Sequence, residues 1–226
     1  MNNNTYTVIC GHYGCGKTNL SLNLAIEKKL SNPERRVIVV DIDIVNPYFR
    51  SSEYSKLLLK YGIELIIPSF AGTTLDTPTL SPKIFSIFTA ENADIFIDAG
   101  GDDAGATALG TISRQLKEQG YEMIYVINKN RVLASSPENA LILLREIEAA
   151  SRLNATAIVN NTHLGVDSTF ENSLESESFA KEVSKEANLP LLYSTVTDFA
   201  LNDNKLPEGF KKIERLVLFP WEMEEE

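Results

Sequence analysis

Short apolar runs alternate with longer segments of mixed character along the whole chain. The runs are rich in β-branched residues, which is typical of β-strands. Several of them, such as VIVV, IFI, YVI and AIV, are apolar at every position rather than at every second one. This pattern favours strands of a parallel sheet that is covered on both faces. The predicted strands are residues 6–10, 36–41, 63–67, 95–98, 123–128, 155–160 and 191–194.

The segments between these runs carry the signals of helices. Pro82 and Pro137 each follow a serine, which suits a helix N-cap followed by a first-turn proline. The pair Asn32-Pro33 ends the first helix, and Gly62 and Gly120 are suited to close two others. The predicted helices are residues 18–30, 52–61, 82–90, 106–119, 137–151 and 174–187.

This alternation predicts an α/β fold with a mostly parallel sheet and helices on both faces. A chain of 226 residues is long enough for one such domain, and no composition break or long linker divides it. We therefore expect one domain over residues 1–226. In folds of this kind ligands bind beyond the carboxyl ends of the strands, so the residues after each strand are the candidates for function.

Composition narrows the choice of partners. The net charge of −10 and the sequence pI near 4.8 argue against nucleic-acid binding, which usually needs a basic surface. The two cysteines, Cys10 and Cys15, have no CxxC spacing, which suits a reducing compartment. No apolar run is long enough for a transmembrane helix, and MNNNTYT lacks the features of a signal peptide. We expect a cytoplasmic protein that contacts neither nucleic acid nor membrane.

The stretch GHYGCGKT, residues 11–18, fits the phosphate-loop pattern G-x-x-x-x-G-K-[ST] at every fixed position. Glycines let backbone N–H groups close around phosphate oxygens, and the following helix adds its positive N-terminal end. Lys17 then reaches the terminal phosphates, and the Thr18 hydroxyl ligates Mg²⁺. The alternative is a glycine-rich turn with a chance Lys-Thr pair. The strand before it and the helix after it favour the phosphate loop.

Acidic residues follow two of the other predicted strands. Asp41 and Asp43 end the strand at 36–41, and their spacing lets both point toward one Mg²⁺–nucleotide site. Asp98 follows three apolar residues, as expected for a carboxylate that grips Mg²⁺ through water. Gly100 and Gly101 give the next loop freedom to approach a γ-phosphate. The alternative for these acids is a polar strand end that caps a helix.

Two asparagines follow the strand at 155–160. Asn160 and Asn161 each carry a donor and an acceptor, so one side chain can recognise a purine edge. Asparagine is also a favoured turn residue, and the sequence leaves that alternative open for Asn160. Asn128, Lys129 and Arg131, after the strand at 123–128, are weaker candidates to contact the ribose, the base or a partner. The two histidines, His12 and His163, lack metal-ligand spacing, so a zinc site is not expected.

Taken together, GHYGCGKT, VVDIDIVNPYF and FIDAGGDDAG resemble the motifs of the MinD/ParA-type ATPases, also called the CobQ/CobB/MinD/ParA nucleotide-binding domain. This family is a branch of the P-loop NTPases, and the resemblance spans nearly the whole chain. It implies a three-layer P-loop fold, ATP rather than GTP, Mg²⁺, slow hydrolysis and a nucleotide-switched dimer. By the same match, Asp41 and Asp43 would form the first switch, residues 98–101 the second, and Asn160 the base-recognising asparagine.

The expected site follows from the motifs and the resemblance. Lys17 and Asp43 are the catalytic candidates: Lys17 polarises the γ-phosphate, and Asp43 orients the attacking water. The candidate Mg²⁺ ligands are Thr18, Asp41, Asp43 and Asp98. The residues expected to contact the nucleotide are Gly11, His12, Tyr13, Gly14, Cys15, Gly16, Lys17, Thr18, Asn19, Gly100, Gly101 and Asn160.

The chain departs from the family at one position. The family has a signature lysine directly after the first glycine of the loop, which reaches a dimer partner's phosphates, whereas this chain has His12. Family branches without that lysine are small-molecule kinases and ligases or metal-centre maturation factors. The hydroxyl-rich loop 69–81 is a candidate acceptor pocket for such an enzyme. We therefore keep three functions open. The first is an ATP-binding switch with weak Mg²⁺-dependent ATPase activity, for which a homodimer is one possible form. The others are an ATP-dependent small-molecule kinase, ligase or metal-centre maturation ATPase, and a nucleotide-gated module for a partner protein. DNA and membrane docking are disfavoured because the chain is acidic and ends in EMEEE.

Overall fold

The computed structural model describes residues 3–42, 54–67, 82–101, 103–218 and 222. Its centre is an eight-stranded sheet with the order β3-β2-β4-β1-β5-β6-β7-β8, in which every neighbouring pair is parallel. The strands are β1 (Thr5–Cys10), β2 (Arg36–Asp41), β3 (Glu64–Ile66), β4 (Ala93–Asp98), β5 (Glu122–Ile127), β6 (Ala157–Asn160), β7 (Leu191–Thr197) and β8 (Phe210–Ile213).

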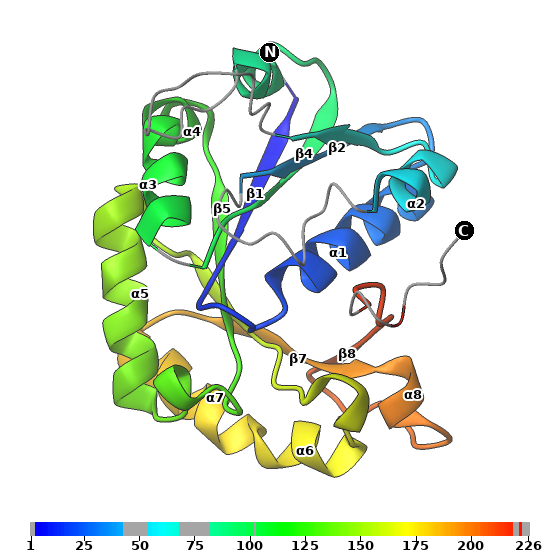
Figure 1. The fold of residues 1–226 in the computed structure, drawn as a ribbon, viewed down its shortest axis with the longest axis vertical. Coiled ribbons are helices and arrows are strands. Elements are labelled where there is room, and N and C mark those ends of the chain that lie inside the picture. The colour runs from blue at the N-terminus through cyan, green and yellow to red at the C-terminus, as the bar shows by residue number, and fades with distance from the viewer. Residues whose placement is uncertain (1–2, 43–53, 68–81, 102, 219–221, 223–226) are drawn as a thin grey trace.

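Helices connect the strands and cover the sheet (Figure 1). The α-helices are α1 (Lys17–Ser31), α2 (Ser55–Lys60), α3 (Asp103–Thr111), α4 (Ser113–Gln119), α5 (Pro137–Ser151), α6 (Phe170–Glu175), α7 (Glu177–Ala187) and α8 (Asp198–Leu201). Three short 3₁₀ helices are η2 (Pro82–Phe88), η3 (Val132–Ala134) and η4 (Gly165–Asp167). No helix in these described parts of the chain is long and apolar enough to cross a membrane.

Alternation along the strands divides the core into two halves. On β1, Val8 and Cys10 face the half that α3, α4, α5 and α7 cover. Ile9 faces the opposite half, against α1 and α2. Figure 1 shows α3 and α5 on one side of the sheet and α1 and α2 on the other. The predicted α/β fold with helices on both faces of a parallel sheet is therefore confirmed.

The position of β1 in the sheet marks where a ligand site is expected. The chain leaves β1 toward β2 and β4 on one side, and later crosses to β5 on the other. A crevice opens at the carboxyl edge of a parallel sheet where the strand order reverses in this way. The loop that joins β1 to α1 lies at that point. It is residues 11–16, the phosphate-loop candidate.

Several predicted elements differ in detail. The predicted helix 106–119 is two helices, α3 and α4, which meet at Ile112, and the predicted helix 174–187 is divided at Ser176. The predicted helix 82–90 is the 3₁₀ helix η2, because its hydrogen bonds close shorter turns. Strand β8 was not predicted. The first residues of predicted helix 52–61 lie outside the described residues, and α2 begins at Ser55.

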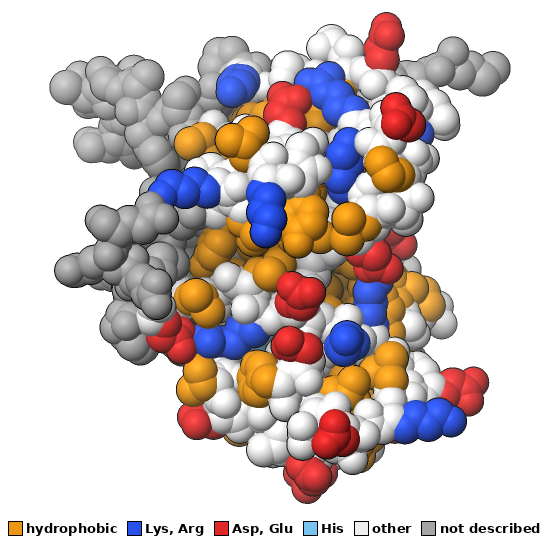
Figure 2. All heavy atoms as spheres, turned by 90° about the vertical axis from the view of Figure 1, so that its right-hand side faces the viewer, with side chains coloured by type: hydrophobic (Ala, Val, Ile, Leu, Met, Phe, Trp, Pro, Cys, Tyr) orange, Lys and Arg blue, Asp and Glu red, His pale blue; other side chains and the backbone are white. Residues whose placement is uncertain are grey.

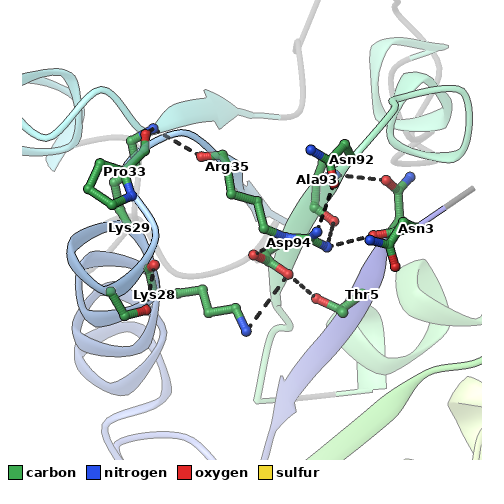
Figure 3. A network of polar contacts seen from close by, with 11 residues as sticks. Asn3, Thr5, Lys28, Lys29, Pro33, Arg35, Asn92, Ala93 and Asp94 are labelled. Carbon is green, nitrogen blue, oxygen red and sulfur yellow. Dashed lines mark hydrogen bonds and ion pairs between the residues drawn. The ribbon is translucent and has the colours of Figure 1, made fainter.

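A buried ion pair joins strands at the amino edge of the sheet (Figure 3). The Asp94 carboxylate is fully buried and accepts from Arg35 Nε at 2.5 Å and from the Thr5 hydroxyl at 2.6 Å. The other nitrogens of the Arg35 guanidinium donate to Asn92 Oδ1 at 2.8 Å and to the Asn3 carbonyl at 2.5 Å. This network fixes the starts of β1, β2 and β4, at the edge opposite the phosphate-loop candidate.

Candidate functional site

The loop between β1 and α1 has the backbone geometry that phosphate binding requires. Gly11, Gly14 and Gly16 have φ values of 146°, 74° and 82°, which residues with a Cβ rarely adopt. Gly16 is the N-cap of α1, and no side chain caps that end of the helix. The first N–H groups of α1 therefore point toward the loop with the positive end of the helix dipole. Together these features form an anion site.

Lys17 is held inside this loop. Its side chain is largely buried, and Nζ donates to the carbonyl of His12 at 3.3 Å. Thr18 follows in the first turn of α1 and lines a cavity beside the loop. The loop thus carries its own cation on the side where the N–H groups gather. This arrangement is suited to hold a phosphate chain.

The loop after β4 packs directly on the phosphate-loop candidate. A Cβ on Gly101 would lie 2.6 Å from the backbone nitrogen of Tyr13 and 2.7 Å from Lys17 Nζ. A Cβ on Gly105 would lie 2.3 Å from the Cα of Gly100. All three distances are shorter than a non-bonded contact of a carbon atom allows, so only glycine fits at these positions. The loop after β4 therefore lies against Tyr13 and Lys17.

Two of the predicted metal ligands lie on neighbouring strands. Asp41 and Asp98 are register partners on β2 and β4, and both are buried. Ser21 of α1 donates to Asp98 Oδ1 at 3.4 Å, so Asp98 faces the start of that helix. Mg²⁺ usually takes one or two carboxylates together with a hydroxyl, waters and phosphate oxygens. Asp41, Asp98 and Thr18 fit this donor set. Asp43 lies outside the described residues.

The described residues contain no cluster of three or more His, Cys, Asp or Glu side chains that would hold a metal ion by themselves. A protein-only cage of the zinc type needs such a cluster. A Mg²⁺ ion that is shared with phosphate oxygens does not.

Side chains from two further loops hold the carbonyl side of the phosphate-loop candidate. Arg131, after β5, donates from Nε to the carbonyl of Gly14 at 2.7 Å. Asn161, after β6, donates from Nδ2 to the carbonyl of Cys15 at 2.7 Å, and its Oδ1 accepts from the Thr195 hydroxyl at 2.5 Å. These two bonds tie the carbonyls of Gly14 and Cys15 to the loops after β5 and β6.

Asn160 and Asn161 have different roles in the structure. Asn160 is buried, and its Nδ2 donates to the hydroxyls of Ser176 at 2.8 Å and Ser194 at 3.0 Å. Its Oδ1 accepts from the Thr162 hydroxyl at 2.7 Å. Asn161, and not Asn160, is among the residues that line the cavity. Base recognition by Asn160 stays a prediction, and the contacts favour its neighbour Asn161 for a place at the ligand.

The cavity beside the loop has a volume of about 430 Å³. Its walls come from the loop itself, the first turn of α1, the segments after β5 and β6, the end of β7, and the end of β8 with the residues after it. The described residues that line it include amides, hydroxyls, two arginines and one lysine, but no Asp or Glu. They are Tyr13, Gly14, Gly16–Asn19, Asn130, Arg131, Asn161–Gly165, Ser168, Ser173, Thr195–Thr197, Ile213, Arg215 and Val217.

The far wall of the cavity is attached to α1 by two asparagines. Asn19 Oδ1 accepts from the backbone nitrogens of Leu216 at 2.8 Å and Val217 at 3.1 Å. Asn23 exchanges two hydrogen bonds with the backbone of Glu214, at 2.8 and 2.9 Å. The side chain of Asn19 thus holds this segment against α1. Of the predicted nucleotide contacts of Asn19, only a contact through its backbone in the first turn of α1 remains. The sequence gives no signal for this docking.

Burial shifts the pKa values of several groups in the site. It raises the pKa of the Cys15 thiol, so this cysteine stays protonated at neutral pH. Burial, Lys17 and Arg131 together lower the pKa of His12. Burial, with smaller contributions from Arg131 and Arg215, lowers the pKa of His163 to about 4. Both histidines are therefore neutral near pH 7, and the loop cation is Lys17.

Figure 2 shows the face of the molecule that includes α1 and α2. Basic and acidic side chains are interspersed on it with apolar ones.

No protein-family model matches the sequence, and a comparison with curated proteins gives no match. Solved structures do match. Cell division protein FtsY from Thermotoga maritima has a TM-score of 0.55 at 17% identity, over 85% of this chain and 62% of that one. The signal recognition particle receptor FtsY from Elizabethkingia anophelis, in complex with GDP, has a TM-score of 0.56 at 17% identity, over 87% and 58%. Chloroplast FtsY from Physcomitrella patens has a TM-score of 0.56 at 14% identity, over 86% and 59%.

The chain thus spans about 60% of the length of these FtsY structures. At such low identity the likeness shows the fold alone. The protein has the P-loop NTPase fold: a parallel sheet between helices, with the phosphate-loop candidate after β1.

Proposed function

We propose that this protein binds ATP with Mg²⁺, hydrolyses it slowly, and acts as a nucleotide switch of the MinD/ParA type. The observation that carries the proposal is the loop of residues 11–18, whose glycines have positive φ and whose Lys17 is buried within it. That loop lies where the strand order of a parallel sheet reverses. Asp41 and Asp98 stand in register on the adjoining strands.

We propose ATP rather than GTP because the motifs resemble those of the MinD/ParA-type ATPases, and the described lining of the cavity is compatible with adenine. The guanine ring presents N–H donors on its Watson–Crick edge, and a carboxylate is the side chain best suited to accept from them. The described residues that line the cavity include no carboxylate. Adenine presents a donor beside acceptors, which amide and hydroxyl side chains can match. The GDP bound in one FtsY structure makes GTP the competitor to test.

The chain's own residues divide the work of phosphoryl transfer. Lys17 and the N–H groups of the loop hold the β- and γ-phosphates and stabilise the charge that develops on them. Thr18, Asp41 and Asp98 would hold Mg²⁺, which neutralises phosphate charge when bound. Asp43 is proposed to orient the attacking water. Gly100 and Gly101, of which Gly101 lies against Lys17, are proposed to form the second switch, which responds to the γ-phosphate.

The switch is proposed to act through a second copy of the chain or through a partner protein. In the MinD/ParA-type family a lysine of the phosphate loop completes the dimer, whereas His12 occupies that position here and is neutral near pH 7. A cation from this position therefore does not reach a partner's phosphates. Sedimentation with ADP and with a non-hydrolysable ATP analogue tests this: a mass that changes with the nucleotide supports a homodimer.

The central experiment is phosphate release from ATP and GTP by the full chain and by Lys17→Ala and Asp43→Ala. We expect slow, Mg²⁺-dependent release from ATP that falls at least tenfold in both variants, because each loses a group that acts in the transition state. Equal rates for all three proteins would refute the proposal. Stimulation of the wild type by one small metabolite, with transfer of phosphate to it, would instead support the kinase or ligase alternative.

A further inference from the structure

One ring nitrogen of His163, Nδ1, has a hydrogen-bond partner within the protein. Its Nδ1 accepts from the backbone N–H of Gly165 at 3.2 Å, which fixes the ring orientation in the loop after β6. A nitrogen that accepts carries no hydrogen. The neutral ring therefore carries its hydrogen on Nε2, so Nε2 is a donor.

The donor nitrogen of this ring has no partner among the described residues. His163 Nε2 is buried and makes no hydrogen bond with them. It lies 3.0 Å from the point where a Cβ of Gly16 would stand, so the ring is directed at the N-terminus of α1. His163 also lines the cavity beside the loop. Buried donors are nearly always paired, so an unpaired donor in a residue that lines a cavity points to a ligand acceptor.

The position of His163 beside the loop indicates which part of the nucleotide it would contact. Phosphate oxygens are bound by the N–H groups on the inner side of the loop. His163 lies instead beside Asn161, which donates to the carbonyl of Cys15. A built Cβ on Gly16 would approach both Asn161 Nδ2 and His163 Nε2. Beyond the phosphates, the nucleoside is the part of the nucleotide that meets this wall.

A purine ring offers the hydrogen-bond acceptor that His163 Nε2–H lacks. Its unprotonated ring nitrogens are acceptors in the ring plane, and a fixed imidazole N–H is a matching donor. The ring stays neutral near pH 7 because burial, Arg131 and Arg215 disfavour its charged form. A neutral donor suits an uncharged base better than an anion.

We propose that His163 recognises the base of the bound nucleotide, with its Nε2–H donating to a ring nitrogen of the purine. This inference rests on the proposed function, since it deepens the nucleotide site. It assigns to His163 a specificity role that Asn160 was expected to have.

The experiment measures dissociation constants by calorimetry for the full chain with ADP, with pyrophosphate, and with ADP analogues in which carbon replaces one ring nitrogen (1-deaza, 3-deaza and 7-deaza). We expect His163→Ala to weaken ADP binding roughly tenfold, the loss of one buried hydrogen bond, and to leave pyrophosphate binding unchanged. One deaza analogue should bind the wild type roughly tenfold more weakly than ADP. In His163→Ala that analogue and ADP should bind equally.

Two further variants separate recognition from loop structure. His163→Gln offers an N–H at a similar reach and should recover part of the ADP affinity. Asp167→Ala changes an exposed residue of the same loop and should keep the wild-type pattern with all ligands.

The possible failures are distinguishable. A wild type that binds neither ADP nor pyrophosphate refutes the proposed function itself. If ADP binds but His163→Ala keeps the wild-type loss with the deaza analogue, the inference is wrong while nucleotide binding stands. An equal loss of ADP and pyrophosphate in His163→Ala also overturns it, because the role is then one of loop structure.

Discussion

The contact between Gly101 and Lys17 makes the loop after β4 a direct neighbour of the phosphate site. We expect Gly101→Ala to weaken pyrophosphate binding at least tenfold, because its Cβ would enter the space of Tyr13 N and Lys17 Nζ and displace both. Gly120→Ala is the matched control. Gly120 has a φ of 82° but open space around its Cβ position, so it should lower the free energy of unfolding by about 1–2 kcal/mol without changing pyrophosphate binding. Calorimetry and urea unfolding measure both effects. Unchanged pyrophosphate binding in Gly101→Ala would contradict the expectation.

Arg131 stabilises the phosphate-loop candidate from its carbonyl side. Arg131→Ala removes the hydrogen bond from Nε to the Gly14 carbonyl, and a bond from a charged donor is worth about 1.5–3 kcal/mol. We expect both ADP and pyrophosphate to bind more weakly, roughly tenfold or more, because the loop itself is loosened. Arg114→Ala, which removes an exposed guanidinium paired only with Glu118 on the surface of α4, is the control and should leave both constants unchanged. This pattern differs from that of His163→Ala, which should affect ADP alone.

The low pKa of His163 also makes stability depend on pH. The folded chain holds His163 with a pKa of about 4, below the ordinary histidine value of 6.5. Between these values the unfolded chain binds more protons, so the stabilisation present above pH 6.5 is lost as the pH falls toward 4. We expect wild type to lose more stability than His163→Gln on acidification over this range, in urea unfolding at several pH values. Parallel losses in the two proteins would show that His163 does not titrate in this way.

At the scale of single residues, the sequence predicts the phosphate-loop candidate better than the groups around it. The glycine pattern of residues 11–16 follows from covalent geometry and is visible in the sequence. The sequence does not show whether Asn160 or Asn161 faces the ligand. Adjacent residues at the end of a strand point in opposite directions, so a prediction that is wrong by one position selects the wrong asparagine. Arg131 and His163 follow strands, as the sequence indicated. Their contacts depend on which loops lie beside one another, which the sequence does not state.

At the scale of elements, continuous apolar runs identify strands well and helix boundaries poorly. The seven predicted strands are all present, because buried parallel strands have a distinctive composition. Strand β8 escapes prediction, since its residues FKKI are half polar and too few to show a pattern. The division at Ser176 also escapes it. There the Ser176 hydroxyl donates to the carbonyl of Ser173 and accepts a hydrogen bond from Asn160 Nδ2. The second bond joins α6 and α7 to the end of β6, and the local sequence does not indicate it.

The segment after β8 depends on α1 for its position. Asn23→Ala removes the paired hydrogen bonds to the backbone of Glu214, and we expect it to lower the free energy of unfolding by about 1–3 kcal/mol. Amide hydrogen exchange at Leu216 and Val217 should become faster, because their segment is less firmly docked. Asn23→Asp keeps the acceptor but loses the donor and should have an intermediate effect. Exchange at Leu216 that is unchanged in Asn23→Ala would show that the Asn19 contacts suffice.

At the scale of the whole molecule, the two edges of the sheet have separate tasks. The carboxyl edge carries glycines, a buried lysine and a histidine nitrogen without a partner among the described residues. These features favour ligand binding and contribute little to stability. The amino edge carries a satisfied ionic network around Asp94 (Figure 3). The sequence predicts the parallel sheet and its ligand edge. It does not predict the order of the strands or the pairing of Arg35 with Asp94, because both depend on contacts between residues far apart in the chain.

This separation predicts that stability can be reduced at the amino edge without a change at the ligand edge. Arg35→Ala leaves the buried Asp94 carboxylate without its closest cation, so we expect the free energy of unfolding to fall by about 3–5 kcal/mol. The double variant Arg35→Ala/Asp94→Ala should be less destabilised than the sum of the two single variants, because it buries no uncompensated charge. Urea unfolding measures these differences. The dissociation constant for ADP, measured well below the unfolding transition, should stay at the wild-type value in all three variants. A loss of ADP affinity in proportion to the loss of stability would mean instead that the two edges of the sheet are energetically coupled.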